Sequence, residues 1–201
     1  VGYIKLSNFM ENAAAEVEGA FLELRDGNAQ MESVILDLRG NPGGLLREAV
    51  KICNLFIEKN ELVVETKGRL SEWDAEFTTR ENPVDLEIKV AVLINHSSAS
   101  ASEIVSGTLQ DLDRGVVIGE RSYGKGLVQT TRPLSYNAQL KLTTAKYYIP
   151  SGRCIQALNY AERRDDGSVG RIPDSLIQEF TTRNGRTVYD GGGIMPDVEV
   201  E

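Results

Sequence analysis

The sequence contains a single histidine, His96, and this scarcity limits the ways in which a hydroxyl group can be activated. Most serine nucleophiles rely on a histidine as general base, because the pKa of a free hydroxyl lies far above 7. His96 lies only four residues before the candidate nucleophile Ser100, so we expect it to shape the loop rather than to act as base. A lysine can serve instead if burial or a neighbouring cation keeps its amine neutral.

Cysteine is also scarce. Cys53 and Cys154 lie far apart in the chain and match no spacing of a structural metal site. Cys53 falls on the apolar face of a predicted helix, which favours a buried free thiol over a disulfide. We therefore predict no metal, and no motif in the chain calls for a cofactor.

Basic residues are outnumbered, with 22 Lys and Arg against 30 Asp and Glu and a net charge of -8. Sequence-independent binding to nucleic acid depends on clustered Lys and Arg, so this balance argues against nucleic-acid partners and against anionic membranes. No apolar run reaches the roughly 18 residues of a membrane-spanning helix. The sequence starts at Val1, where we identify neither an initiator Met nor a signal peptide. The length of 201 residues predicts one well-cored domain over residues 1–201.

Apolar runs and helical patterns alternate along much of the chain. The nearly continuous apolar runs at residues 34–38 and 90–94 are typical of buried parallel strands. Residues 45–57 place apolar side chains at helical spacing, and a further helix is predicted from about residue 101 to residue 112. This alternation predicts an α/β fold with a mostly parallel β-sheet and flanking helices.

Two later parts of the chain differ from this pattern. Residues 127–134 and 139–149 predict a β-hairpin. Residues 159–192 are polar and rich in turn-forming residues, so we predict an excursion from the core there, with a short helix at residues 172–182.

A glycine-rich stretch at residues 119–125 matches a phosphate-binding loop preceded by a strand. The match fails at the next position, where Gly126 replaces the Ser or Thr that would hold Mg²⁺. Residues 127–131 are strand-like where the motif needs the N-terminus of a helix. The sequence therefore disfavours nucleotide binding, and the nucleophile-elbow pattern Gly-x-Ser-x-Gly is absent.

Ser100 opens the helix that follows the strand at residues 90–94. Free backbone N–H groups and the positive end of the helix dipole are available at such a position, and they would stabilise an oxyanion. The alternative is that Ser98, Ser100 and Ser102 are small polar residues at a helix start, one of them a cap. Taken alone, a serine-rich helix start favours the alternative.

Lys125 and Gln129 favour the catalytic interpretation. In a strand, positions 125, 127 and 129 point to one face, so the Gln129 amide can orient the Lys125 amine by a hydrogen bond. Gly124 and Gly126 would let this lysine enter a crowded site without side-chain clashes. Exposed lysines in turns are common, so these residues alone decide nothing.

With these features together, the chain resembles the catalytic core of the tail-specific, or C-terminal processing, serine peptidases. The shared segments run from one end of the chain to the other and follow the same order as in the family. They are Gly2-Tyr3-Ile4, Leu36-Asp37-Leu38-Arg39-Gly40-Asn41-Pro42-Gly43-Gly44, Ser98-Ala99-Ser100-Ala101-Ser102-Glu103, Tyr123-Gly124-Lys125-Gly126 with Gln129, Tyr148-Ile149-Pro150-Ser151-Gly152-Arg153 and Gly192-Gly193-Ile194-Met195-Pro196-Asp197.

The resemblance implies a Ser-Lys dyad. The family's nucleophile is the middle serine of the triplet and its general base is a lysine 25 residues later, which are Ser100 and Lys125 here. Gln129 corresponds to the residue that positions the lysine. The implied reaction is acyl transfer, in which Ser100 attacks a peptide carbonyl after Lys125 has taken its proton.

The resemblance also implies an oxyanion hole made of backbone N–H groups. One donor is expected from Ala101 and the other from the glycine pair, with Gly44 favoured over Gly43. Glu103 and Asp111 match acidic positions of the family near the site, and we expect supporting roles for both.

The family's fold is crotonase-like, of the ClpP/crotonase type, in agreement with the alternation of strands and helices. The implied substrates are polypeptides, cut at or near their C-terminal tails. A PDZ domain that binds peptides, and a signal or anchor, normally precede the strand at Gly2-Tyr3-Ile4, and both are absent from this sequence. The family's location is periplasmic or otherwise extracytoplasmic.

Two other functions compete with peptide cleavage. The first is a peptide-binding or scaffolding module that keeps the fold without turnover, an alternative that the missing upstream domain supports. Such a module has no need of Ser100, Lys125 and Gln129 at these spacings. A Ser-Lys amidase or esterase that acts on small molecules is the second alternative, and comparing peptide with small-ester turnover would separate the two enzymes.

Overall fold

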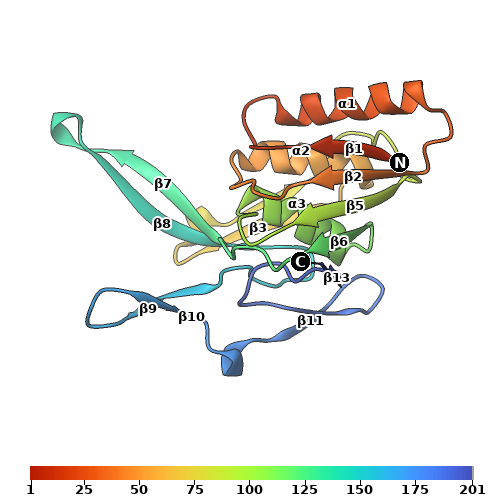
Figure 1. The fold of residues 1–201 in the computed structure, drawn as a ribbon. Helices are drawn as coiled ribbons and strands as arrows, with labels where there is room; N and C mark the ends of the chain where they lie inside the picture. The colour runs from red at the N-terminus through yellow and green to blue at the C-terminus, as the bar shows by residue number, and fades with distance from the viewer. Residues whose placement is uncertain (201) are drawn as a thin grey trace.

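The central feature is a five-stranded sheet in which each neighbouring pair of strands is parallel (Figure 1). The computed structural model describes residues 1–200 and, apart from residues 161, 162 and 174, their side chains. The strand order is β1-β2-β5-β6-β13, with bounds β1 (Gly2–Lys5), β2 (Ser33–Asp37), β5 (Lys89–Ile94), β6 (Gly115–Gly119) and β13 (Val198–Glu199). The predicted α/β fold with a parallel sheet is confirmed.

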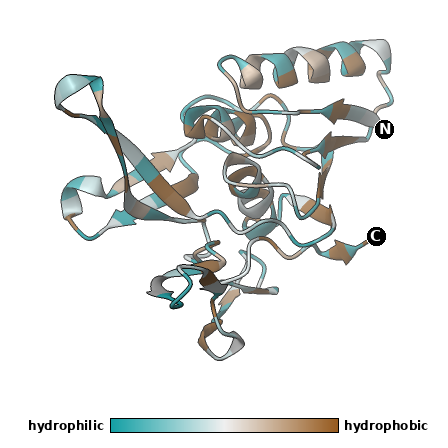
Figure 2. Cartoon of the chain, turned by 60° about the vertical axis from the view of Figure 1, so that its left-hand side comes forward, coloured by the Kyte–Doolittle hydropathy of each residue, from teal (hydrophilic) through white to brown (hydrophobic). Residues whose placement is uncertain are grey.

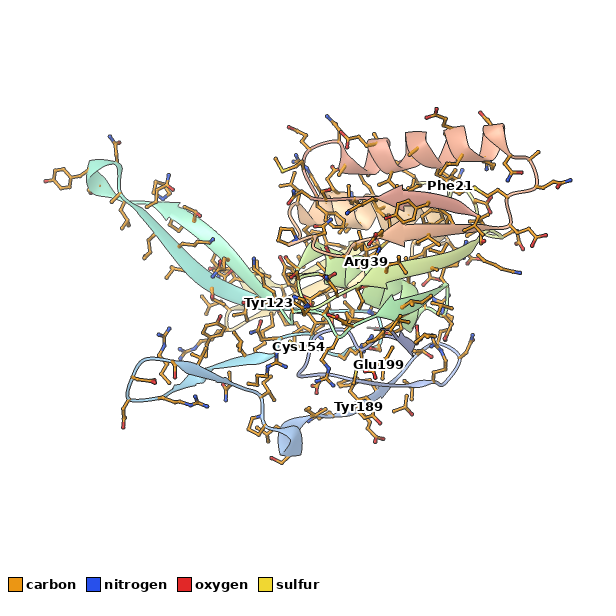
Figure 3. The ribbon with its side chains drawn as sticks, in the orientation of Figure 1. Phe21, Arg39, Tyr123, Cys154, Tyr189 and Glu199 are labelled. Carbon is orange, nitrogen blue, oxygen red and sulfur yellow. The ribbon has the colours of Figure 1, made fainter. Side chains whose placement is uncertain are left out.

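Three helices accompany this sheet: α1 (Ala13–Gly27), α2 (Leu46–Phe56) and α3 (Ala101–Asp111). Each residue of α3 is buried, so α3 lies inside the molecule, whereas α1 lies at its edge and carries both hydrophilic and hydrophobic residues (Figure 2). Phe21 of α1 packs edge to face against Phe56 of α2, with ring centroids 5.5 Å apart (Figure 3). None of the helices, over the residues described, is long and apolar enough to cross a bilayer.

A second sheet is antiparallel and has the strand order β4-β3-β8-β7. Its strands β7 and β8 form a long hairpin that extends away from the rest of the molecule (Figure 1), and Tyr136 at its turn is fully exposed. The elements are β3 (Leu62–Gly68), η1 (Ser71–Trp73), β4 (Ala75–Thr78), β7 (Leu127–Pro133), η2 (Ser135–Asn137) and β8 (Gln139–Tyr148).

The chain between β8 and β13 forms two small antiparallel pairs of strands. They are β9 (Leu158–Arg163) with β10 (Val169–Arg171), and β11 (Glu179–Thr181) with β12 (Thr187–Tyr189); η3 (Asp174–Leu176) lies between the pairs. The helix predicted at residues 172–182 is wrong, since η3 is a single 3₁₀ turn and β11 is a strand. Pairing with β12 satisfies the β11 backbone, and this tertiary contact outweighs the helical spacing of a short apolar stretch.

Candidate active site

Ser100 lies between β5 and α3 in a backbone conformation that non-glycine residues rarely adopt. Its φ is 57° and its ψ is -111°, so the surrounding structure must hold it there against steric strain. The Ser100 N–H donates a 2.8 Å hydrogen bond to Glu103 Oε2, one turn along α3. The Ser100 side chain is partly exposed at the start of a helix, where a nucleophile is accessible.

The two flanking serines of the triplet have structural partners instead. The Ser98 hydroxyl donates to the carbonyl of Leu38 at 2.8 Å, and the Ser102 hydroxyl donates to the carbonyl of Asn41 at 2.9 Å. Both side chains are fully buried. Of the three serines, only Ser100 reaches the surface, which supports the choice made from the sequence.

The glycine pair after β2 lies against the start of α3. A Cβ on Gly43 would lie 2.8 Å from the Ser100 Cβ and 2.9 Å from the Ala101 nitrogen, so only glycine permits this approach. The Gly43 N–H donates to Asn41 Oδ1 at 2.9 Å and is not available to a ligand. Within residues 1–200, the N–H groups of Gly44 and Ala101 have no acceptor. This supports Gly44 over Gly43 as the second oxyanion donor.

Lys125 lies in the loop between β6 and β7, and its side chain is exposed. A small cavity of about 50 Å³ is lined by Lys125, Leu127 and Gln129. The three side chains therefore lie on the same face of the chain, as the strand periodicity of this segment predicts. In the part of the chain described, Lys125 forms a hydrogen bond through its backbone N–H to Glu103, but neither its amine nor the Gln129 amide has a hydrogen-bond partner. The Lys125 side chain is thus open to solvent in this structure, and no hydrogen bond joins it to Ser100.

Glycines let the Lys125 loop approach the segment before β9. A Cβ on Gly124 would lie 2.3 Å from the Ala157 Cβ, and one on Gly126 would lie 2.6 Å from the Gln156 nitrogen. Backbone bonds hold this contact, because the Ala157 N–H donates to the Gly124 carbonyl at 3.0 Å. Tyr123, the residue before Gly124, lies where the β7–β8 hairpin meets the body of the protein (Figure 3).

A buried carboxylate, Glu103, connects the serine and lysine segments. Its Oε2 accepts the N–H groups of Ser100 and Lys125, each at 2.8 Å. Its Oε1 accepts the Ser122 hydroxyl and the Gly124 N–H, each at 2.6 Å. Burial raises the pKa of Glu103, and the four hydrogen bonds oppose that rise by stabilising the ionised form. Glu103 thus joins the backbone of the serine segment to that of the lysine segment.

Ser122, which no sequence motif singled out, lies between Glu103 and Ile194. Its hydroxyl accepts the Ile194 N–H at 2.6 Å while it donates to Glu103. The only sequence signals were its place in the glycine-rich stretch at residues 119–125 and the Gly193-Ile194 pair among the shared segments.

Asp111 lies at the opposite end of α3 from Ser100, about 16 Å along the helix axis at 1.5 Å per residue. It forms a buried ion pair with Arg153 at 2.8 Å and accepts the Ser151 N–H at 3.0 Å. The structure therefore places Asp111 away from the nucleophile, contrary to the expectation of an acidic residue near the site.

His96 contacts Glu120 and makes no hydrogen bond to Ser100. Its Nδ1 lies 2.8 Å from Glu120 Oε2, and both side chains are exposed. Cys53 is a buried free thiol and Cys154 is a free thiol of intermediate exposure. Among the residues described, no group of three or more His, Cys, Asp or Glu side chains is placed to hold a metal ion.

Comparisons with known proteins agree on one family. The model of "Peptidase family S41" matches residues 1–162. A carboxy-terminal-processing protease of Bartonella bacilliformis is 42% identical over 181 residues, which cover 89% of this chain and 39% of that protein. A probable CtpA-like serine protease of Staphylococcus haemolyticus is 40% identical over 160 residues, covering 77% of this chain and 31% of that protein. The chain thus spans well under half the length of these relatives.

Solved structures show the same likeness. The photosystem II D1 C-terminal processing protease superposes with a TM-score of 0.74 at 28% identity, over 99% of this chain and 42% of that one. A putative S41 protease of Bacteroides fragilis superposes with a TM-score of 0.67 at 17% identity, over 99% of this chain and 46% of that one. At that lower identity, the second match is evidence for the fold alone.

Proposed function

We propose, because this chain belongs to peptidase family S41, that it is the catalytic core of a serine endopeptidase that cleaves polypeptides at or near their C-terminal tails. Ser100 would be the nucleophile and Lys125 the general base, with Gln129 orienting the lysine. The observation that carries this proposal is the combination at Ser100: an accessible hydroxyl on a strained backbone, next to the Ala101 N–H and in contact with Gly43, whose neighbour Gly44 supplies a second N–H. Neither N–H has an acceptor among the residues described.

The reaction proceeds by acyl transfer. The Lys125 amine takes the proton from Ser100 Oγ, and this oxygen forms a bond to the carbonyl carbon of the scissile peptide. The resulting oxyanion accepts hydrogen bonds from the N–H groups of Ala101 and Gly44, each donor contributing about 2.7 to 4 kcal/mol to the transition state. Lys125 then gives its proton to the leaving amine and removes one from the water that hydrolyses the ester.

Substrate binding completes this site. The Lys125 side chain is exposed and has no partner among the residues described, so it can rotate toward Ser100 when a polypeptide covers the cavity that it shares with Gln129. Covering the cavity also removes water from the amine, which favours its neutral form. Glu103 already holds the backbone of both segments, so the step that remains is a side-chain movement.

The finer assignments follow from the family resemblance. We propose that the fold is of the crotonase-like type and that residues 1–201 form one peptidase core, with an excursion at about residues 159–192. We further propose that the whole protein carries a PDZ domain, which receives the polypeptide substrate, and acts outside the cytoplasm.

Labelling by a fluorophosphonate tests the nucleophile in the complete protein. We expect modification at Ser100, its loss in Ser100→Ala, and its retention in Ser97→Ala, which changes an exposed serine of the same loop. Label found on Ser98 or Ser102 would contradict the assignment.

Peptide hydrolysis tests the base. We expect Lys125→Ala to abolish cleavage and Lys141→Ala, an exposed lysine of the neighbouring hairpin, to leave it unchanged. In the wild type kcat/KM should rise with pH, since only a neutral amine accepts a proton. Cleavage that survives in Lys125→Ala, or a rise that depends on His96, would refute the dyad. Turnover of small esters without peptides would favour the esterase alternative, and binding without turnover the scaffolding module.

A further inference from the structure

The segment before β13 lies against the loop that carries Lys125. The Ser122 N–H donates to the Ile194 carbonyl at 3.0 Å, and the Ile194 N–H donates to Ser122 Oγ at 2.6 Å. Ser122 is 5% exposed and Ile194 is fully buried, so water cannot replace either bond. Ile194 lies outside the stretch that the S41 family model matches, residues 1–162.

The Ser122 hydroxyl uses both its donor and its acceptor capacity. It accepts the Ile194 N–H while its own proton is donated to Glu103 Oε1 at 2.6 Å. Glu103 in turn accepts the backbone N–H groups of Ser100 and Lys125. The Ser122 hydroxyl therefore joins Glu103, which binds the backbone of both proposed dyad residues, to the segment at residues 193–194, called the late segment below.

Close packing fixes the other side of this contact. Gly193 has a φ of 77°, and a Cβ there would lie 2.7 Å from Ser122 Oγ and 3.0 Å from the Gly124 nitrogen. Ile194 also packs on α3, because a Cβ on Gly107 would lie 2.7 Å from the Ile194 Cδ1. The late segment is thus wedged between the nucleophile's helix and the lysine's loop.

We propose that Ser122 is a positioning residue for the Ser-Lys dyad, acting through Glu103 and held in place by Gly193 and Ile194. The inference rests on the proposed function for its catalytic consequence. Without the hydroxyl, Glu103 Oε1 loses one of its two donors and the Ile194 N–H loses its acceptor. The loop at residues 122–125 then loses one hydrogen bond on each side, and the remaining backbone bonds to Glu103 and to the Ile194 carbonyl hold the loop, and with it the Lys125 amine, less rigidly relative to Ser100.

The predicted effect is on kcat rather than on KM. Ser122 is buried and reaches no surface that a substrate can touch, so ground-state binding is preserved. A displacement of about 1 Å in a reacting group can cost on the order of a hundredfold in rate. We therefore expect Ser122→Ala to lower kcat between about tenfold and a hundredfold, with KM within about twofold.

The experiment compares three variants of the complete protein with the wild type. Ser122→Ala removes the hydroxyl, and Ser122→Thr keeps it. Ser106→Ala is the matched control, because Ser106 is another buried serine hydroxyl near Glu103, but it donates to the Ser102 carbonyl at 2.9 Å and not to the carboxylate. Rates of peptide cleavage are divided by the concentration of sites titrated with a fluorophosphonate. Amide hydrogen exchange of Gly124, Lys125 and Ile194 is measured in parallel.

The proposal is supported if kcat per titrated site falls in Ser122→Ala, recovers in Ser122→Thr and is unchanged in Ser106→Ala. Hydrogen exchange at the amides of Gly124, Lys125 and Ile194 should accelerate only in Ser122→Ala. An unchanged kcat per titrated site in Ser122→Ala, or unchanged exchange at Gly124 and Lys125, would overturn the proposal. If the wild type itself cleaves no peptide, the proposed function fails, and the exchange data still decide whether Ser122 holds the lysine loop.

Discussion

The two ends of α3 each hold a buried carboxylate, and they satisfy it in different ways. Glu103 in the first turn accepts hydrogen bonds only from neutral groups, namely three backbone N–H groups and the Ser122 hydroxyl. Asp111 in the last turn pairs with the Arg153 guanidinium at 2.8 Å. Burial raises the pKa of both carboxyls, so both need compensation to stay ionised.

The helix dipole explains the difference. A negative charge is favoured at the N-terminus of a helix, where Glu103 lies, and disfavoured at the C-terminus, where Asp111 lies. Glu103 therefore needs no cation to stay ionised, and its oxygens accept backbone N–H groups from the segments of Ser100 and Lys125. Asp111 needs Arg153, which is itself buried and also donates to the Gln110 side chain at 2.7 Å. At the N-terminal end of α3, Glu103 binds the segments of Ser100 and Lys125. At the C-terminal end, the Asp111–Arg153 pair holds the helix in place.

Removing the cation should have the largest effect on stability. Arg153→Met leaves Asp111 buried without its charged partner, so we expect the free energy of unfolding in urea to fall by about 3 to 5 kcal/mol. The double variant Arg153→Met/Asp111→Leu removes both charges and should recover most of this loss. Activity per folded molecule should remain. A cost below about 1 kcal/mol for Arg153→Met alone would show that α3 needs no cation at this end.

Changing Glu103 should lower the free energy of unfolding less than Arg153→Met does, but it should lower the peptide-cleavage rate more. Glu103→Gln replaces one acceptor oxygen with an NH₂ group that faces N–H donors, at an expected cost of about 1 to 3 kcal/mol. The peptide-cleavage rate per folded molecule should fall with it. Glu48→Gln is the matched control, because Glu48 is buried in the first turn of α2 and accepts the Ala14 N–H at 3.0 Å. Equal loss of activity in both variants would remove the distinction between the two ends of α3.

A carboxylate outside α3 sharpens the comparison through its pH dependence. Burial opposes ionisation of Asp37, but hydrogen bonds from Arg39 and Tyr3 prevail and lower its pKa from 3.8 to about 2. Because the folded state holds the proton less tightly, stability is present above pH 4 and is lost as pH falls toward 2.

We expect a loss on the order of 1 kcal/mol over this range, reduced by solvent around the half-exposed Arg39. Asp37→Asn should remove this part of the acid sensitivity. The free energy of unfolding in urea is measured at pH 4 and at pH 2.5. An equal fall in this free energy in the wild type and in Asp37→Asn would contradict the assignment.

The smallest effect should come from a surface ion pair. Arg47 and Glu11 lie 3.1 Å apart, but both side chains are mostly exposed. We expect Glu11→Ala, which leaves the contact of Arg47 with the buried Glu48 in place, to change the free energy of unfolding by about 0.5 kcal/mol or less, because solvent and salt screen exposed pairs. A larger change would show that the screening assumed for exposed charges fails in this protein.

Local sequence patterns were sufficient for the central part of the fold. The apolar runs at residues 34–38 and 90–94 became β2 and β5, because strands covered on both faces must be apolar along their length. The helix at residues 172–182 was mispredicted because helical spacing in a short segment carries little energy compared with strand pairing to β12.

The sequence by itself determined which residue types and spacings are present: Ser100 at a helix start, Lys125 between two glycines, and Gln129 in phase with it. Tertiary structure decided how they are arranged, because the deciding contacts join residues far apart in the chain. Asn41 uses the N–H of Gly43 and leaves that of Gly44 free. Asp111 lies one helix length from Ser100, and the Ser122 hydroxyl meets partners, Glu103 and Ile194, that are 19 and 72 residues away. Such hydrogen bonds depend on distance in space, which spacing along a chain does not specify.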